Sequence, residues 1–94
     1  MKTSMDDVFI TNLPSLDLHG EIRSSARVLI KEFVEDNYLL KNEKVIIIHG
    51  VGTGALKDET YKVLKSNKHV EDFHINHYNP GCTLVYIKKR FDLE

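Results

Sequence analysis

Two short motifs hold the residues most able to do chemistry. Leu16-Asp17-Leu18-His19-Gly20 places a carboxylate and an imidazole two positions apart, and His49-Gly50-Val51-Gly52-Thr53-Gly54 combines an imidazole with three glycines. A carboxylate beside an imidazole can orient the histidine, hold a divalent metal or serve as an acid–base pair. A glycine-rich loop lets backbone amides come close to an anion. The first ligand to consider is therefore a phosphate, as in a nucleic-acid backbone.

The glycine motif does not match either of the common nucleotide-binding loops. Lys57 follows Leu56 and precedes Asp58, so the Gly-x-x-x-x-Gly-Lys-Ser/Thr pattern is not met, and the glycine spacing is not that of a dinucleotide fold. Local physics still favours an anion site, because a predicted helix begins behind the loop and Thr53 can cap it or donate to a phosphate. The alternative is a tight strand–helix turn that needs glycine only for packing.

The elements that position these motifs follow from hydrophobic periodicity. Helical spacing of apolar residues predicts two helices, and alternating or continuous apolar runs predict four strands. The predicted strands cover residues 13–18, 45–48, 70–77 and 82–87, and the predicted helices cover residues 21–39 and 55–67. Asn79-Pro80-Gly81 is predicted to be the turn of a closing hairpin. The order is therefore βαβαββ.

The strand patterns also predict how the sheet is arranged. The first and third strands alternate between polar and apolar residues, as edge strands do, whereas the second and fourth are apolar on both sides, as interior strands are. A mixed four-stranded sheet of order 1-2-4-3 satisfies this pattern. Right-handed crossovers would place both helices on one face, giving an α/β two-layer sandwich. Asp17 and His19 would share the open face, and the two motifs would meet at one sheet edge.

Composition limits the organisation and the class of protein. The chain has 94 residues, 41% of them hydrophobic, and a formal net charge of −1. This predicts one domain over residues 13–90, a flexible arm over residues 1–12, and a tail or cloning remnant over residues 91–94. The apolar runs are too short to cross a membrane and no signal peptide is evident, so we expect a cytoplasmic protein without a membrane partner.

The remaining histidines and the single cysteine carry weaker signals. His69, His74 and His77 do not match the spacing of a closed zinc site, and Cys82 is the only thiol. His74 and His77 are three apart on a predicted strand, so they are expected to face opposite ways. Cys82 has no activating partner nearby in sequence and is expected to be a buried strand thiol.

At this point the residues resemble a known family, the Smr (small MutS-related) domain. Leu16-Asp17-Leu18-His19-Gly20 resembles its Leu-Asp-x-His-Gly motif. The run from Val45 to Gly54 is similar to its strand followed by His-Gly-x-Gly-x-Gly. The resemblance extends over residues 13–88. It implies a two-layer α/β sandwich like the C-terminal domain of a bacterial translation initiation factor.

The resemblance also implies a function and a set of site residues. Smr domains are associated with nicking of DNA, cleavage of RNA or binding of nucleic acid, often at the C-terminus of MutS-like proteins. Asp17 and His19 become the candidate catalytic pair, with Asp17 the ligand if Mg²⁺ or Mn²⁺ is used. The residues expected to bind nucleic acid are His49, Gly50, Gly52, Thr53, Gly54, Lys57, Gly81 and Thr83.

Two departures from the family pattern are visible. The family's third motif, a glycine-rich hairpin ending in threonine, is reduced here to Asn79-Pro80-Gly81-Cys82-Thr83, and Val51 occupies a loop position that is often basic in the family. Together with the net charge of −1, these changes weigh against tight binding of nucleic acid more than against the fold.

Three functions therefore stand side by side. The first is an endonuclease that nicks or cleaves DNA or RNA with little sequence preference. The second is a module that binds branched DNA or ribosome-associated RNA without cutting it, with the ribosome or the rest of a MutS-like chain as partner. The third is a protein–protein adaptor that uses the open sheet face or the lysine-rich helix, which fold alone does not exclude.

Overall fold

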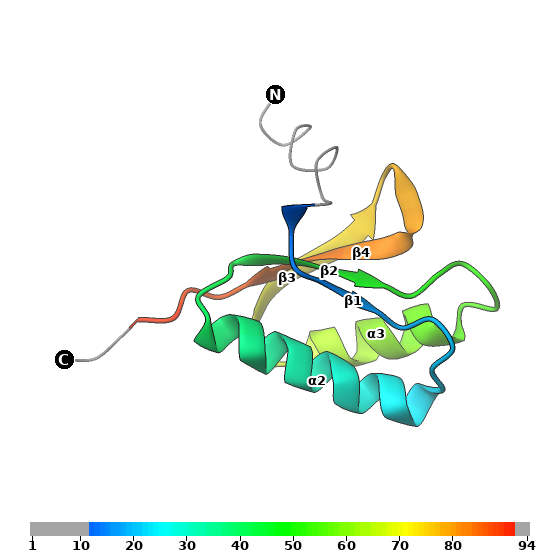
Figure 1. The fold of residues 1–94 in the computed structure, drawn as a ribbon, viewed down its shortest axis with the longest axis horizontal. Helices are drawn as coiled ribbons and strands as arrows, with labels where there is room; N and C mark the ends of the chain where they lie inside the picture. The colour runs from blue at the N-terminus through cyan, green and yellow to red at the C-terminus, as the bar shows by residue number, and fades with distance from the viewer. Residues whose placement is uncertain (1–11, 92–94) are drawn as a thin grey trace.

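A computed structural model describes residues 12–91 of the chain. The expected arm and tail lie outside the described residues, apart from Asn12 and Phe91. The elements follow the predicted order βαβαββ (Figure 1). They are β1 (Ser15–Asp17), α2 (Arg23–Leu39), β2 (Lys44–Ile48), α3 (Ala55–Ser66), β3 (Val70–Asn76) and β4 (Asn79–Ile87).

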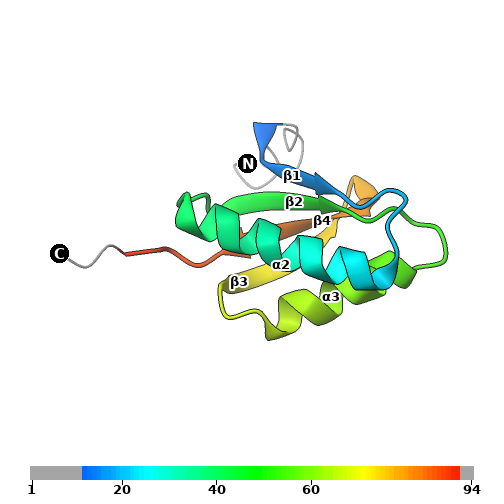
Figure 2. The same ribbon diagram turned by 60° about the horizontal axis from the view of Figure 1, so that its bottom comes forward.

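The sheet has the predicted strand order, β1-β2-β4-β3. β1 runs parallel to β2, and β4 runs antiparallel to both β2 and β3. Both helices cover the same face of the sheet, as Figures 1 and 2 show. The two-layer arrangement predicted from the alternation of polar and apolar residues is thus confirmed.

The main core lies between the helices and the sheet. Alternate residues of the strands point into it, together with one stripe of each helix, which is the pattern that burial on a single face requires. Its fully or nearly fully buried members are Leu18, Ala26, Ile30, Val34, Val45, Ile47, Val63, Leu64, Val85 and Ile87.

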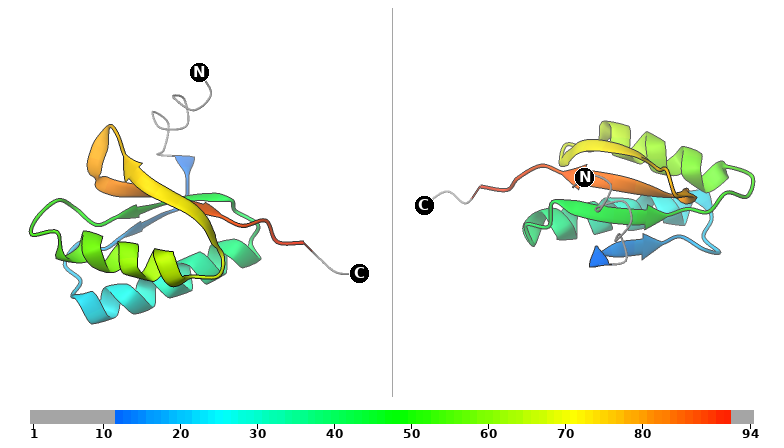
Figure 3. Two further views of the ribbon diagram at one scale, coloured as in Figure 1. Left: turned by 180° about the vertical axis from the view of Figure 1, so that it is seen from behind. Right: turned by 90° about the horizontal axis from the view of Figure 1, so that it is seen from above.

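The opposite face of the sheet carries a second, smaller apolar cluster. It consists of Ile46, Cys82 and Leu84, with Leu13, Ile48 and Tyr86 packed against it. This face is turned toward the reader in the right-hand view of Figure 3, with no helix of the described residues in front of it. Asp17 pairs with Ile48 and Ile48 pairs with Cys82, so these three residues form one row across the sheet.

The hairpin differs from its prediction. Its turn lies at His77 and Tyr78, and β4 already begins at Asn79, so the turn expected at Asn79-Pro80-Gly81 is wrong. The ladder is irregular between Ile75 and Asn76, and this irregularity accommodates proline within a strand because the local register is broken there.

The prediction that His74 and His77 face opposite ways is also wrong. Their ring centroids lie 6.1 Å apart. His77 belongs to the turn, where the alternation of a strand no longer applies. Within residues 12–91, no helix is both long and apolar enough to cross a membrane.

Candidate functional site

The two motifs meet at one edge of the sheet because their strands are parallel neighbours. The amide of Leu18 donates to the carbonyl oxygen of Ile48 at 2.9 Å, which ties the end of β1 to the end of β2. Between the two junctions lies a cleft of about 390 Å³. Its lining residues are Asp17, His19, Gly20, Ile48, His49, Gly50, Gly52 and Leu56.

Asp17 and His19 are both exposed and both line this cleft. Asp17 ends β1, and its Oδ1 accepts a hydrogen bond from the backbone amide of His19 at 2.9 Å. His19 lies beyond the strand, in a turn that continues into Gly20 with a positive φ of 81°. The two side chains are therefore brought together by this turn and not by the pleat of a longer strand.

Cys82 and the Asp17 carboxylate lie on the open face of the sheet, in one row with Ile48. Burial raises the pKa of the Cys82 thiol above its usual value, and the charge of Asp17 raises it further. Cys82 is a free, buried cysteine, as the sequence predicted. A raised pKa keeps the thiol protonated, which suits a packing role and not nucleophilic chemistry.

His49 occupies a different environment from His19. Only 7% of it is exposed, and both ring nitrogens are engaged: Nε2 with Thr83 Oγ1 at 2.8 Å and Nδ1 with the Gly50 carbonyl at 2.9 Å. A carbonyl oxygen can only accept, so Nδ1 carries a proton and Nε2 of the neutral ring accepts from the Thr83 hydroxyl. Burial is the largest cause of a lowered pKa at His49, and the nearby Lys57 lowers it as well, against the Gly50 hydrogen bond.

Gly81 anchors the glycine loop to β4. Its carbonyl oxygen accepts from the amides of both His49 and Gly50, each at 2.9 Å. A Cβ added at Gly81 would lie 3.2 Å from Asn79 Oδ1 and 3.3 Å from the Gly50 Cα, so glycine permits this close approach. Thr83 is fully buried beneath the same loop. Gly81 and Thr83 thus contact the loop directly.

The outer part of the loop faces solvent. Gly52 and Thr53 are exposed, and Gly54 adopts a left-handed φ of 86° as the N-cap residue of α3. The N-cap residue is thus Gly54, and the prediction of Thr53 as N-cap is wrong, because the helix begins one residue later. Thr53 Oγ1 instead accepts from the amide of Ala55 at 3.3 Å, in a turn just before the helix. A second cleft of about 400 Å³ opens here, at a helix N-terminus, where backbone amides and the helix dipole favour anions.

Lys57 brings a positive charge to this end of α3. Its Nζ lies 5.7 Å from the centroid of the Tyr61 ring, and that ring lies edge-on to His49 with centroids 6.4 Å apart. The lysine is therefore held near the loop by an aromatic contact.

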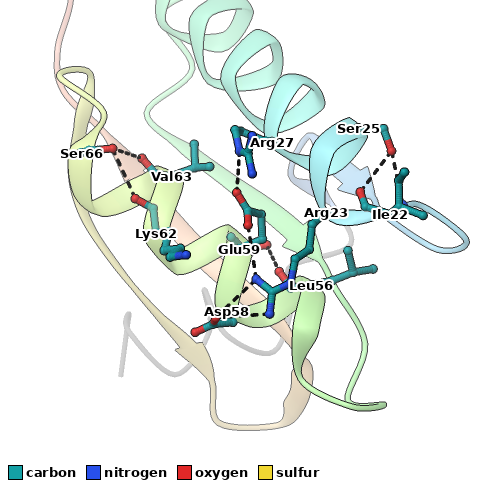
Figure 4. A network of polar contacts seen from close by, with 11 residues as sticks. Ile22, Arg23, Ser25, Arg27, Leu56, Asp58, Glu59, Lys62, Val63 and Ser66 are labelled. Atoms are coloured by element: carbon teal, nitrogen blue, oxygen red, sulfur yellow. Dashed lines mark hydrogen bonds and ion pairs between the residues drawn. The ribbon is translucent and has the colours of Figure 1, made fainter.

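One cluster near the site was not singled out from the sequence. Glu59 of α3 is 3% exposed and is bound by Arg27 Nε at 2.8 Å and by Arg23 Nη1 at 3.3 Å (Figure 4). Arg23 also reaches Asp58 at 3.4 Å. The hydrogen bond from Arg27 is the largest cause of the lowered pKa of Glu59. These partners are more than 30 residues apart in sequence, so only the packing of α2 on α3 reveals them.

A divalent metal would find one carboxylate in the main cleft. Among residues 12–91, no group of three or more His, Cys, Asp and Glu side chains is arranged to hold a metal ion. Mg²⁺ is often bound through one or two carboxylates together with substrate phosphates and water. Asp17 fits that sparse mode of binding.

Fold and site together define a class: a two-layer α/β domain in which two glycine-containing junctions form one cleft at a sheet edge. The Smr domain family model matches residues 16–88, and the chain belongs to this family. It is 37% identical over 80 residues to the endonuclease MutS2 of Caldanaerobacter subterraneus, covering 82% of this chain but 10% of that protein. The chain thus spans about a tenth of the length of the curated relatives it matches.

Solved structures agree on the fold. The Smr domain of Thermus thermophilus MutS2 superimposes with a TM-score of 0.79 at 26% identity, covering 81% of this chain and 99% of that one. YdaL, a stand-alone small MutS-related protein from Escherichia coli, superimposes with a TM-score of 0.71, and the match covers 80% of this chain and 64% of the YdaL chain. At 20% identity, the YdaL likeness concerns the fold alone.

Proposed function

We propose that this domain binds nucleic acid and cleaves its phosphodiester backbone, as an endonuclease of low sequence specificity. The observation that carries the proposal is the single cleft that joins the exposed pair Asp17 and His19 to the glycine loop. The family membership supports it, since the MutS2 relatives are named endonucleases. In this proposal the reactive phosphate lies in the cleft, and the glycine loop binds it there.

Binding would rely on backbone groups and one lysine. Gly50 and Gly52 line the cleft, and the N-terminus of α3 lies directly behind the loop. Amides at a helix N-terminus suit a phosphate whatever base it carries. Lys57 would add a charge that salt can screen. Low sequence preference follows, because none of these groups reads a base.

The chemistry would fall to the exposed pair. Asp17 would act as a general base or a metal ligand, and His19 as its partner or as the acid that protonates the leaving oxygen. Both roles require access to substrate, and both side chains are exposed in the cleft. His49, Gly81 and Thr83 would instead hold the loop in the shape that binds phosphate. Their contacts with the loop support this division.

Mg²⁺ or Mn²⁺ would be held by Asp17 together with phosphate oxygens. When bound, such an ion would polarise the phosphate and stabilise developing charge. We further propose that the domain works in the cytoplasm on DNA or RNA, including ribosome-linked RNA, and that it can act within a longer MutS-like chain.

Cleavage assays with a matched pair of variants test the proposal. Supercoiled plasmid and a structured RNA are incubated with the protein in Mg²⁺, Mn²⁺ or EDTA, beside Asp17→Asn and Asp72→Asn. Asp72 is exposed on β3, outside the cleft, so its variant makes the same change in charge elsewhere. We expect cleavage by the wild type and by Asp72→Asn, and loss of cleavage in Asp17→Asn. Full activity of Asp17→Asn would overturn the catalytic assignment.

A second function, binding without cleavage, is favoured by one specific contact. The Oδ1 atom of Asp17 is already engaged by the amide of His19, so the carboxylate also has a structural role in the turn. This function predicts salt-sensitive binding that Lys57→Ala weakens. Retained binding without cleavage by the wild type would establish it in place of the nuclease, whereas neither cleavage nor binding would indicate a protein partner.

A further inference from the structure

The surface between the two helices forms a groove that begins beside the glycine loop. We call it the helical groove; it combines two clefts of about 280 Å³ and 340 Å³ that share Lys31, Val63 and Ser66. α2 and α3 lie side by side on the outer face of the molecule (Figure 2). They run in the same direction, because Arg23 meets Asp58 near their beginnings while Glu35 meets His69 near their ends. The cleft at the start of α3 lies at the head of this groove.

The acidic side chains along the groove and its head all have hydrogen-bond or ion-pair partners. The lining contains five basic residues (Arg23, Arg27, Lys31, Lys62, Lys68) and three acidic ones (Glu21, Glu35, Glu59). Every one of these carboxylates has a partner. Glu59 binds two arginines, Glu35 accepts from His69 Nε2 at 2.9 Å, and Glu21 accepts from Ser25 at 2.9 Å.

The lysines of the groove differ from these carboxylates. Within the part of the chain that the structure describes, Lys31, Lys62 and Lys68 make no ion pair. Figure 4 shows Lys62 on α3, one turn beyond the glutamate that the two arginines bind. The groove therefore presents uncompensated positive charge on a chain whose net charge is −1. This local excess suits a polyanion.

A cleft on the other side of the sheet has a smaller excess of positive charge. It has a volume of about 610 Å³, and its lining includes Glu43 and Glu71 beside Lys44, Lys88 and Lys89. Neither glutamate has an ion pair among residues 12–91. Unpaired carboxylates would repel a phosphate backbone, so the two faces differ in their suitability for nucleic acid.

We propose that the helical groove binds the sugar–phosphate backbone of the same nucleic acid whose reactive phosphate lies in the cleft of Asp17 and His19. This inference rests on the proposed function and extends it, since it gives the strand a path over the helices. From Arg23 to Glu35, α2 rises about 18 Å, enough for roughly five phosphates of one duplex strand. Lysines contact phosphates without reading bases, so the path adds affinity and no sequence preference.

Fluorescence anisotropy with two double variants tests the groove. The probes are a fluorescein-labelled DNA duplex of about 20 base pairs and a single-stranded RNA of similar length. Lys31→Ala/Lys62→Ala removes two groove charges, and Lys65→Ala/Lys89→Ala removes two exposed lysines outside the groove. All four lysines are exposed, so both variants should fold. We expect the groove variant to bind about tenfold more weakly, with the salt slope reduced by about 2.

The control separates the groove from a general effect of charge. We expect Lys65→Ala/Lys89→Ala to bind within about twofold of the wild type. Equal losses in both variants, or wild-type affinity in the groove variant, would overturn the groove while leaving the proposed function in place. If the wild-type protein neither binds nor cleaves the probes, the groove and the proposed function are both overturned.

Discussion

The two strand–helix junctions resemble each other in sequence and differ in structure. Each contains a histidine followed by glycine, and both line the same cleft. After β1, His19 is exposed, and within residues 12–91 only its backbone amide makes a hydrogen bond, to Asp17. After β2, His49 is buried and both of its ring nitrogens are engaged. One junction leaves its imidazole exposed at the cleft, and the other uses its imidazole to hold a loop.

The register of the two strands explains this difference. Along β2, alternation directs Ile47 into the main core, Ile48 to the open face and His49 back to the helix side. Along β1, Leu18 faces the main core and Asp17 pairs with Ile48, so the same alternation directs His19 away from the core. A histidine–glycine pair therefore acquires its role from its position in the alternation of its strand.

Replacing each histidine by alanine should affect a different property: His19→Ala should lower cleavage, and His49→Ala should lower stability. The effect on cleavage is expected to be the largest. We expect His19→Ala to lower the cleavage rate at least about 100-fold, because a proton-transfer group is lost. Its free energy of unfolding should stay within about 0.5 kcal/mol of the wild type, since the side chain is exposed. His77→Ala, at the exposed hairpin turn, is the matched control for plasmid nicking. Wild-type nicking by His19→Ala would remove the contrast.

His49→Ala should instead reduce stability. The change opens a cavity and leaves the Thr83 hydroxyl without its partner, which we expect to cost about 2–4 kcal/mol of unfolding free energy. Thr83→Val keeps the shape and removes the hydrogen bond, at an expected cost of about 1–2 kcal/mol. Urea denaturation measures both values. A loss below about 0.5 kcal/mol in His49→Ala would show that the imidazole is not part of the fold.

Two glycines of the predicted nucleic-acid-binding set should separate folding from binding. Gly81→Ala would crowd Asn79 and Gly50, and we expect a loss of about 1–2 kcal/mol in unfolding free energy. A Cβ at Gly52 would meet no atom of residues 12–91 within 4 Å, and Gly52 has no positive φ, so Gly52→Ala should change stability by less than about 0.5 kcal/mol. Its new methyl group would still occupy space at the cleft, so binding of a DNA duplex should weaken. Unchanged binding in Gly52→Ala would place the phosphate elsewhere.

The smallest expected effect is a two-stage loss of stability in acid. The pKa of His49 is lowered from 6.5 in the folded state, so the unfolded chain takes up its proton first and stability falls as pH drops below about 6.5. The pKa of Glu59 is lowered from 4.5, so its contribution is lost only as pH falls below about 4.5. Thermal unfolding between pH 8 and pH 3 measures both stages. His49→Gln should flatten the first stage and leave the second.

Much of the fold was predictable because burial leaves a periodic trace in the sequence. The apolar run of β2 and the alternation of β3 gave their places in the sheet, and the crossover rule gave the side of the helices. The shared edge of the two motifs followed from the parallel pairing of their strands. The location of the cleft at this edge therefore follows from the sequence pattern.

Other features of the fold and the site depend on contacts that leave no periodic pattern of apolar residues in the sequence. Proline and glycine predicted a turn at Asn79-Pro80-Gly81, but the irregular ladder places these residues inside β4. The burial of His49 depends on Thr83 of β4 and Tyr61 of α3, which are distant from it in sequence. The pairing of Glu59 with Arg23 and Arg27 needs two helices in register. Whether Asp17 and His19 are catalytic stays a prediction.

The carbonyl of Gly81 has a consequence for which changes in length the chain can accept during evolution. Hairpin turns usually tolerate inserted residues, because the added chain extends into solvent. Here the turn at His77 and Tyr78 lies only a few residues before the carbonyl that holds His49 and Gly50. An insertion that shifts β4 by one position would replace that carbonyl and misplace a loop some 30 residues away in sequence. Insertions at this turn should therefore be rarer among functional variants than at the turn between α2 and β2.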